Sequence, residues 1–142
     1  MKAYVASGWF SPEQEESRLD IINALTEAGI EMYSPKDDNM HKDGVTNPKE
    51  VYFENLQNIE NADFIVASTE GKDMGTIFEC GLAAGWDIPI VYYWKGGTGA
   101  FNLMLSQSGI AVHTDFNSLL DHLVGIKIQK EVYEIPYTGE NE

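Results

Sequence analysis

The sequence contains one cysteine, few basic residues and no long apolar run. Because Cys80 is alone, an internal disulfide and a cysteine-rich zinc site are both excluded. Lys and Arg total 9 against 23 Asp and Glu, for a formal charge of −14, so no basic patch is available to bind nucleic-acid phosphates. No apolar segment is long enough to cross a bilayer, and Met1 leads into a strand pattern without a signal peptide. We therefore expect a cytoplasmic protein that binds neither nucleic acid nor membranes.

The motifs of metal sites and of common nucleophiles are also missing. The three histidines, His41, His113 and His122, are scattered without metal-ligand spacing. There is no Gly-x-Ser-x-Gly elbow, and the glycine-rich run 96–99 lacks the Lys-Ser/Thr of a phosphate loop. The polar segment 39–44 is only faintly similar to a calcium loop, because its first and third ligand positions are wrong. We expect no metal and no cofactor.

The chain is long enough for one packed domain, with 142 residues of which 43% are hydrophobic. Short apolar runs alternate with helix patterns, which is typical of β-α units around a parallel sheet. The strands are expected at 3–6, 30–33, 63–68, 89–93 and 110–113. The helices are expected to begin at the caps Ser11, Asn47, Asp73 and Asp115, and a further short helix is expected near 102–106. The predicted architecture is a single α/β domain over residues 1–142, a flavodoxin-like doubly wound sheet of about five mainly parallel strands.

The first predicted helix illustrates both the capping and the packing pattern. Ser11, followed three positions later by Gln14, predicts an N-cap with a capping box. Apolar residues at spacings of three, Leu19, Ile22 and Leu25, are expected to face the core.

Parallel strands would bring the connections after the first four strands to one edge of the sheet, where open α/β folds bind ligands. These connections contain Trp9 and Phe10, a polar segment at 35–48 that predicts a long loop, Asp73, and the run 96–99. Long loops in compact domains are often functional. We therefore expect the ligand site at this edge.

Glu79 is the only charged residue between Met74 and Trp86. An unpaired buried carboxylate costs several kcal/mol, so it must be neutralised, hydrogen-bonded or opened onto a cleft. An acid among small and apolar residues, with Asp73 close by, is typical of a carboxylate prepared for chemistry. The alternatives are a core-edge glutamate bonded to a tyrosine or a backbone amide and, for Asp73, a helix N-cap. We favour an enzyme in which Glu79 is the reactive group.

Three aromatic residues could contribute to the same site. Trp9 and Phe10 could stack on a flat ligand such as a nucleobase, or they could be ordinary core aromatics. Tyr4 could hydrogen-bond Glu79, although taken alone it is more typical of a core residue. Cys80 is expected to be a small buried hydrophobe and not a nucleophile.

Three blocks of the chain carry a resemblance, and they are YVASGWF at 4–10, DMGTIFECG at 73–81 and FNLM at 101–104. In this order they resemble the nucleoside 2-deoxyribosyltransferase family. The first is similar to the family's first strand and aromatic loop, and the second to its Asp-x-Gly-x-x-x-Glu-x-Gly signature. The third is similar to an Asn-Leu-Met segment that reaches a neighbouring subunit's site.

The resemblance implies a covalent mechanism. Glu79 would attack the anomeric carbon of a 2-deoxynucleoside, expelling the base and forming a glycosyl-enzyme ester. A second base would then attack this carbon from the other face, so configuration is retained overall. The resemblance also implies that Tyr4 orients the carboxylate and that Asp73 binds sugar hydroxyls. The implied partners are a 2-deoxynucleoside and a free nucleobase.

The resemblance also implies which residues bind the two ends of the substrate. Trp9 and Phe10 would line the base pocket, and Asn39 stands about where the family places a base-reading amide. Asn102 would reach in from a neighbouring protomer and hold the 5′ hydroxyl beside Met104. A homo-oligomer, a dimer or a multiple of it, is therefore implied, with Asn102 completing the neighbour's site.

Asn55 departs from the family pattern. The family commonly has an aspartate at this position, where it protonates the leaving base. An asparagine can donate a hydrogen bond but cannot deliver a proton. Either Glu54, Asp37 or Asp38 takes the acid role, or protonation is weaker and base preference is altered.

Two other functions are left open. An N-glycoside hydrolase of (deoxy)nucleoside 5′-monophosphates would share the fold and the glutamate, but the acidic balance and Asn102 favour an uncharged 5′ end. A non-catalytic nucleotide-sensing module would bind a ligand without turnover. Such a sensor has no need of a carboxylate in an apolar helix, so we prefer the enzyme.

Overall fold

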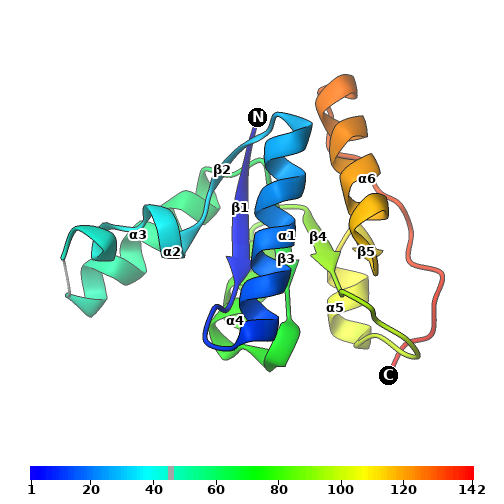
Figure 1. Cartoon of the computed structure of the whole chain (residues 1–142), viewed down its shortest axis with the longest axis horizontal. Helices are drawn as coiled ribbons and strands as arrows, with labels where there is room; N and C mark the ends of the chain where they lie inside the picture. The colour runs from blue at the N-terminus through cyan, green and yellow to red at the C-terminus, as the bar shows by residue number, and fades with distance from the viewer. Residues whose placement is uncertain (45–46) are drawn as a thin grey trace.

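Five strands form one sheet in the computed structural model, which describes residues 1–44 and 47–142 (Figure 1). They are β1 Lys2–Ser7, β2 Glu31–Tyr33, β3 Phe64–Ser68, β4 Ile90–Tyr93 and β5 Ala111–His113. Their order is β2-β1-β3-β4-β5, and every neighbouring pair is parallel. This is the flavodoxin-like order, so the expected fold class is confirmed.

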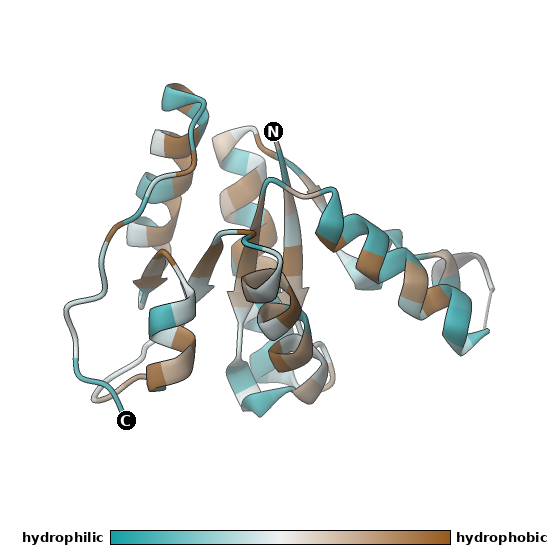
Figure 2. Cartoon of the chain, turned by 180° about the vertical axis from the view of Figure 1, so that it is seen from behind, coloured by the Kyte–Doolittle hydropathy of each residue, from teal (hydrophilic) through white to brown (hydrophobic). Residues whose placement is uncertain are grey.

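Helices cover both faces of the sheet. One face carries α1 (Pro12–Ala28) and α6 (Phe116–Gln129), which lie side by side in Figure 1. The other face carries α3 (Pro48–Glu60), α4 (Met74–Gly85) and α5 (Leu103–Ser108), seen in front in Figure 2. In that view α4 is largely brown, as expected for a helix whose only charged residue is Glu79.

The segment expected to be a long loop contains short helical turns, so that prediction is wrong for residues 35–43. The turns are α2 (Pro35–Asp38) and η1 (Met40–Asp43), and a third, η2 (Glu70–Lys72), follows β3. Pro at the first helical position and the Asn39 cap of η1, whose side chain accepts from the His41 N–H, favour these turns over an open loop. Residues 45–46 of the predicted loop lie outside the described residues.

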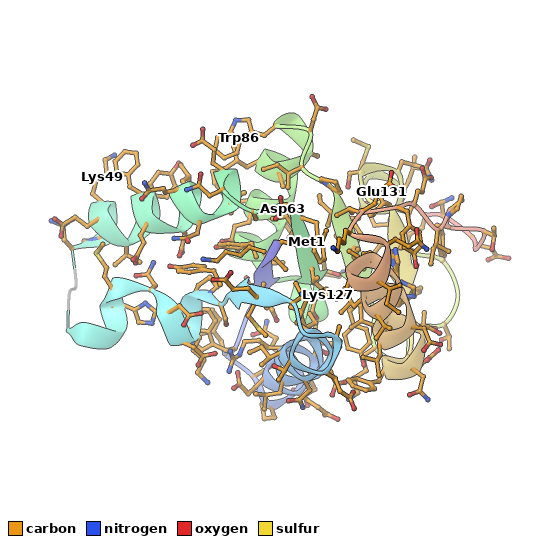
Figure 3. All side chains as sticks on the ribbon, turned by 90° about the horizontal axis from the view of Figure 1, so that it is seen from above. Met1, Lys49, Asp63, Trp86, Lys127 and Glu131 are labelled. Atoms are coloured by element: carbon orange, nitrogen blue, oxygen red, sulfur yellow. The ribbon has the colours of Figure 1, made fainter. Side chains whose placement is uncertain are left out.

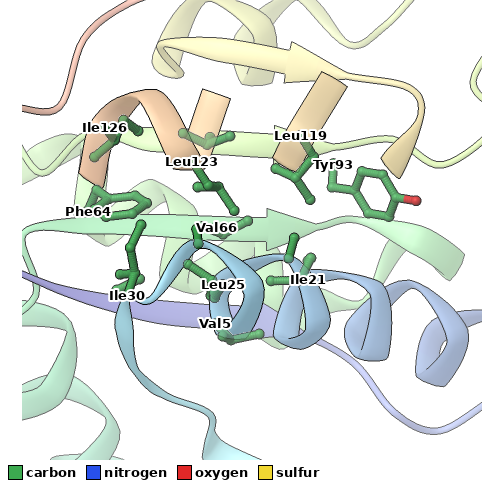
Figure 4. Packing of buried hydrophobic residues seen from close by; sticks show 14 of the residues in the cluster. Val5, Ile21, Leu25, Ile30, Phe64, Val66, Tyr93, Leu119, Leu123 and Ile126 are labelled. Carbon is green, nitrogen blue, oxygen red and sulfur yellow. The ribbon is translucent and has the colours of Figure 1, made fainter. Parts of the chain in front are cut away.

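Strand alternation divides the core into two clusters, one on each face. Val5 and Val66 point to the α1 and α6 side, where they meet Leu25 and Leu123 (Figure 4). Tyr4, next to Val5 in the strand, points the other way and packs on the side of α3 and α4. Each face of β1 and β3 is therefore buried, which is typical of a central parallel strand.

The helix starts agree with the sequence, but the buried face of α1 does not. Each of the four predicted caps accepts a hydrogen bond from a backbone N–H two or three residues ahead. The prediction that Leu19 faces the core is wrong, since Leu19 is 43% exposed. A spacing of three drifts around a helix of 3.6 residues per turn, and the buried stripe instead follows Ile21, Ala24, Leu25 and Ala28.

The carboxyl ends of all strands point to the lower edge of the sheet in Figure 1. Figure 3 looks onto the opposite edge, where Met1, Asp63 and Lys127 lie, and shows Lys49 at the far end of α3. No helix in the described part of the chain is both long and apolar enough to traverse a membrane.

Candidate active site

A cleft of about 310 Å³ opens at the carboxyl edge of the sheet, between the connections after β1, β2 and β3 and the helices α3 and α4. Five of the nine residues predicted for the site line it, namely Trp9, Phe10, Asn55, Asp73 and Glu79. Its size lies at the lower end of the range for small-molecule sites. The expected location of the site is therefore matched by a cleft.

Glu79 lies in the second turn of α4, partly buried, and its carboxyl group faces the cleft. Its Oε2 accepts a hydrogen bond from the Tyr4 hydroxyl. Burial raises the pKa of Glu79 to about 7; the negative charge of Asp73 also raises it, and the Tyr4 hydrogen bond lowers it. Among the described residues no Lys, Arg or His pairs with this carboxylate. The group is thus poised between its charged and neutral forms near neutral pH.

Tyr4 is completely buried in the middle of β1, on the face that packs against α4. The register of β1 with β2 places it beside Tyr33, and the two rings stack with centroids 5.6 Å apart. Burial and the neighbouring Glu79 carboxylate raise the pKa of Tyr4 well above its ordinary value. Tyr4 therefore remains a neutral hydrogen-bond donor whose position is set by its packing.

Asp73 both caps a helix and borders the cleft. As N-cap of α4, its Oδ2 accepts from the Thr76 N–H at 2.9 Å and from the Thr76 hydroxyl at 2.8 Å. The same residue lines the cleft. Gly8 lies so close that an added Cβ would sit 3.0 Å from Asp73 Cγ and 2.7 Å from Gln14 Oε1. A glycine is needed here for the β1 connection to pass against the cap.

Trp9 and Phe10 form an aromatic pair at the mouth of the cleft, with centroids 4.9 Å apart. Phe10 is 74% exposed, so it is not a core residue. Gln14 holds their loop: its Oε1 accepts from the Phe10 N–H at 2.8 Å, and its Nε2 donates to the Glu70 carbonyl at 3.1 Å. The expected capping box is therefore modified, because the Gln14 side chain bonds to the N–H before the Ser11 cap.

Asn55 lines the cleft, and Asn39 lies behind it, completely buried. Asn39 Nδ2 donates to Asn55 Oδ1 at 2.8 Å, and the Tyr33 hydroxyl donates to the same oxygen at 3.1 Å. Asn39 thus supports Asn55 and is not itself in the cleft wall.

The three acids considered as replacements for the missing aspartate all have other partners. Glu54 Oε2 accepts from the Met40 N–H at 2.6 Å, and Asp38 Oδ2 accepts from the Ser34 N–H at 2.8 Å. Asp37 forms an ion pair with the buried Arg18 at 2.7 Å. None of the three lines the cleft in the described part of the chain.

A family model for nucleoside 2-deoxyribosyltransferases matches residues 3–123, which is most of the chain. The chain belongs to this family. No match is found among curated proteins.

Solved structures share the fold of this family member. A 2-deoxyribosyltransferase from Bacillus psychrosaccharolyticus is similar with a TM-score of 0.79 and 22% identity, over 96% of this chain and 99% of that one. A 2-desoxiribosyltransferase from Leishmania mexicana is similar with a TM-score of 0.66 and 21% identity, over 87% of this chain and 97% of that one. A CMP N-glycosidase from Clostridium botulinum is similar with a TM-score of 0.61 and 16% identity, over 87% of this chain and 98% of that one. At these identities the similarity shows the common fold.

Two predicted site residues of this nucleoside 2-deoxyribosyltransferase family member lie outside the cleft. Asn102 caps α5 by accepting from the Leu105 N–H at 3.1 Å, and it lines a separate hollow beside Trp94. Met104, on the first turn of α5, is 76% exposed. Both are therefore on the surface and do not meet Glu79 within one chain.

The apolar walls of the cleft, formed by Pro35, Tyr52, Leu56 and Phe78, were not predicted from the sequence. The α3 positions Tyr52 and Leu56 are four residues apart, and this helical spacing is the signal that could have indicated a shared face. No comparable signal marked Pro35, because its place depends on how α2 packs.

Among the described residues no three His, Cys, Asp or Glu side chains are grouped so that they could hold a metal ion. The described cleft brings together two carboxyl groups, Glu79 and Asp73, with the Tyr4 hydroxyl, the Asn55 amide and aromatic walls.

Proposed function

We propose that this protein exchanges the nucleobase on 2-deoxyribonucleosides through a covalent deoxyribosyl ester of Glu79, with retention of configuration. One observation carries the proposal: the Glu79 carboxyl group faces a cleft of nucleoside-binding size while the Tyr4 hydroxyl holds one of its oxygens. Membership of the nucleoside 2-deoxyribosyltransferase family supports chemistry at the anomeric carbon. We place the reaction in nucleotide salvage in the cytoplasm.

The ionised form of Glu79 is the nucleophile. Oε2 is engaged by Tyr4, whereas Oε1 has no hydrogen-bond partner within the described chain and is the oxygen that attacks. An Oε1–C1′ bond forms as the C1′–N bond breaks, and the electron pair of that bond stays on the base. In the second half the incoming base attacks C1′ from the opposite face and releases the carboxylate.

The remaining cleft residues bind the two ends of the nucleoside. Trp9 and Phe10 stack on the base, and Asn55 contacts its edge from α3. Asp73, whose Oδ1 is not used by the helix cap, accepts a hydrogen bond from a sugar hydroxyl. All four residues that are given a role here line the cleft.

Intact-mass measurement tests the covalent step directly. Incubation with a 2-deoxynucleoside is expected to add one deoxyribosyl group to the protein, and Glu79→Ala and Glu79→Gln are expected to abolish it. Glu60→Gln, an exposed acid at the end of α3, is the matched control and keeps the adduct. An adduct that persists in Glu79→Ala contradicts the assignment.

A second chain completes each site in this proposal. Asn102 and the exposed Met104 lie away from their own cleft, and they approach the 5′ hydroxyl bound by a neighbouring protomer of a dimer or a multiple of it. Mixing two inactive variants, Glu79→Ala and Asn102→Ala, then restores activity, because mixed dimers contain one site with both native residues. Failure to restore activity, with both variants shown to exchange subunits, excludes the shared site.

Hydrolysis of a nucleoside 5′-monophosphate is the second candidate, because a CMP N-glycosidase shares the fold. A phosphate needs cationic or amide donors, and no Lys or Arg lines the described cleft. Free base released from deoxyadenosine, measured with and without an acceptor base, separates the two activities. Release that is independent of the acceptor refutes the transferase proposal, and binding without any release in the parent protein would instead indicate a sensing module.

A further inference from the structure

A directed chain of hydrogen bonds ends at the cleft. The His41 backbone N–H donates to Asn39 Oδ1 at 3.1 Å, and Asn39 Nδ2 donates to the Val51 carbonyl at 3.1 Å. A backbone N–H can only donate and a carbonyl can only accept, so these two contacts fix which end of the Asn39 amide is oxygen and which is nitrogen.

The orientation of Asn55 follows from that of Asn39. Because the second hydrogen of Asn39 Nδ2 points to the Asn55 side chain at 2.8 Å, the atom that receives it is the amide oxygen. The Tyr33 hydroxyl donates to the same oxygen at 3.1 Å. Asn39 and Tyr33 are both buried, so the oxygen of Asn55 is used on the inner side.

The amide nitrogen of Asn55 therefore remains for the cleft. Asn55 lines the cleft, and its Nδ2 has no hydrogen-bond partner within the described chain. Every buried side-chain nitrogen or oxygen in the described chain does have a partner, so Nδ2 is not buried and is open to the cleft. An N–H₂ group donates two hydrogen bonds and accepts none.

No carboxyl group of α3 lines the described cleft. The two carboxyl groups that line it, Asp73 and Glu79, both belong to α4 or its cap, whereas Asn55 belongs to α3. The aromatic pair Trp9 and Phe10 lines the same cleft. Asp73 and Glu79 are assigned to the sugar in the proposed function, and no other Asp, Glu, Lys, Arg or His lines the described cleft, so a base beside Asn55 meets an N–H donor and aromatic faces without an assigned acid.

We infer that Asn55 selects 2-deoxynucleosides whose base departs as a stable anion, by donating its N–H to an acceptor on that base. The inference rests on the proposed function and goes beyond it by naming the leaving-group class. The C1′–N bond breaks as the Glu79–C1′ bond forms, the electron pair stays on the base nitrogen, and the base takes a proton from solvent after release. Asn39 and Tyr33 are positioning residues that keep the donor turned to the cleft.

Two substrates with the same sugar test this inference. 2-Deoxyuridine and its 5-fluoro derivative differ by one small atom, and fluorine makes the N–H of the free base more acidic and its anion more stable. Without an acid, the single-turnover rate of base release follows anion stability, so the fluorinated substrate is expected to react about tenfold faster or more. Equal rates for the two substrates overturn the inference.

Asn55→Asp is the decisive variant, because it keeps the oxygen that Tyr33 and Asn39 bind and replaces the cleft-facing donor by an acceptor. At pH 8 the release of both bases is expected to slow roughly 100-fold, the cost of losing one donor to a developing negative charge. The rate of the variant relative to the parent at the same pH should recover as pH falls and the new carboxyl group is protonated. An unchanged rate overturns the inference.

Two control variants separate the Asn55 donor from a general charge effect and from a neighbouring imidazole. Gln57→Glu adds a carboxylate on an exposed position of the same helix and is expected to change neither rate. His41→Gln removes an imidazole that stacks on Trp9 with centroids 6.4 Å apart, and the ratio between the two substrates should stay the same. A wider ratio in that variant would make His41 the acid and overturn the inference.

No release from any nucleoside refutes the transferase proposal as well, whereas release at equal rates refutes this inference alone.

Discussion

Removing the hydroxyl of Tyr4 should raise the pKa of Glu79 and slow the reaction at neutral pH. That hydroxyl donates to Glu79 Oε2, and the hydrogen bond lowers a pKa that burial has raised to about 7. A hydrogen bond to a charged group contributes about 1.5–3 kcal/mol. At 1.36 kcal/mol per pKa unit, its loss in Tyr4→Phe moves the pKa of Glu79 upward by roughly 1–2 units.

The ionised fraction of Glu79 then falls from about one half at pH 7 to roughly one tenth to one hundredth. Single-turnover base release, measured from pH 5 to 10, should show the midpoint of its rise move from near 7 to about 8–9. Tyr92→Phe is the matched control, because Tyr92 is a buried tyrosine on the same face of the sheet that bonds to the Ser108 hydroxyl instead. A midpoint that does not move in Tyr4→Phe would refute the reasoning.

Three further predictions concern stability. Glu79→Gln should be more stable than the parent at pH 8 by about 1–3 kcal/mol and equally stable below pH 4.5. The reason is that a carboxyl group whose folded-state pKa is raised destabilises the fold only once it ionises. Equal urea midpoints at pH 8 would contradict this. Arg18→Met should lower the free energy of unfolding by about 2–3 kcal/mol, since Arg18 is 3% exposed and pairs with two carboxylates. Lys95→Met, at an exposed ion pair, should lower it by under about 1 kcal/mol. Similar losses in both variants would show that burial of the ion pair is irrelevant. Burial lowers the pKa of His113 to about 4, so as pH falls from about 6.5 towards 4 the unfolded chain takes up a proton that the folded one does not, and stability is lost. His113→Gln should remove about 2 kcal/mol of this pH-dependent loss between pH 7 and 4.5, and an unchanged slope would exclude His113 as its source.

Elements that depend on neighbours in the chain were predicted well. Ser11 and Asp73 cap the helices that they were expected to cap, because an N-cap bond joins residues only two or three positions apart. The buried strand Phe64–Ser68 was recognised from its apolar run. The face of α1 was misassigned at Leu19, because several apolar positions on this helix compete and only the packing of α6 decides among them.

The candidate site was predicted in part for the same reason. Glu79 stands out locally as a lone charge in an apolar helix, and the hydrogen bond expected from Tyr4 is present across 75 positions of sequence. Asn39 was expected near the base, yet it lies behind Asn55. Nothing local distinguishes an amide that faces a ligand from one that supports another side chain.

The sequence by itself determined the order of strands and helices, the helix starts, and the presence of a reactive-type carboxylate at Glu79. These features follow from short-range patterns of polarity and backbone capping. The tertiary structure alone decided that Asn55 turns its nitrogen to the cleft, that Pro35 and Tyr52 form its walls, and that Asn102 stays outside it. Each of these depends on strand register and on contacts between elements far apart in the chain, which local composition does not encode.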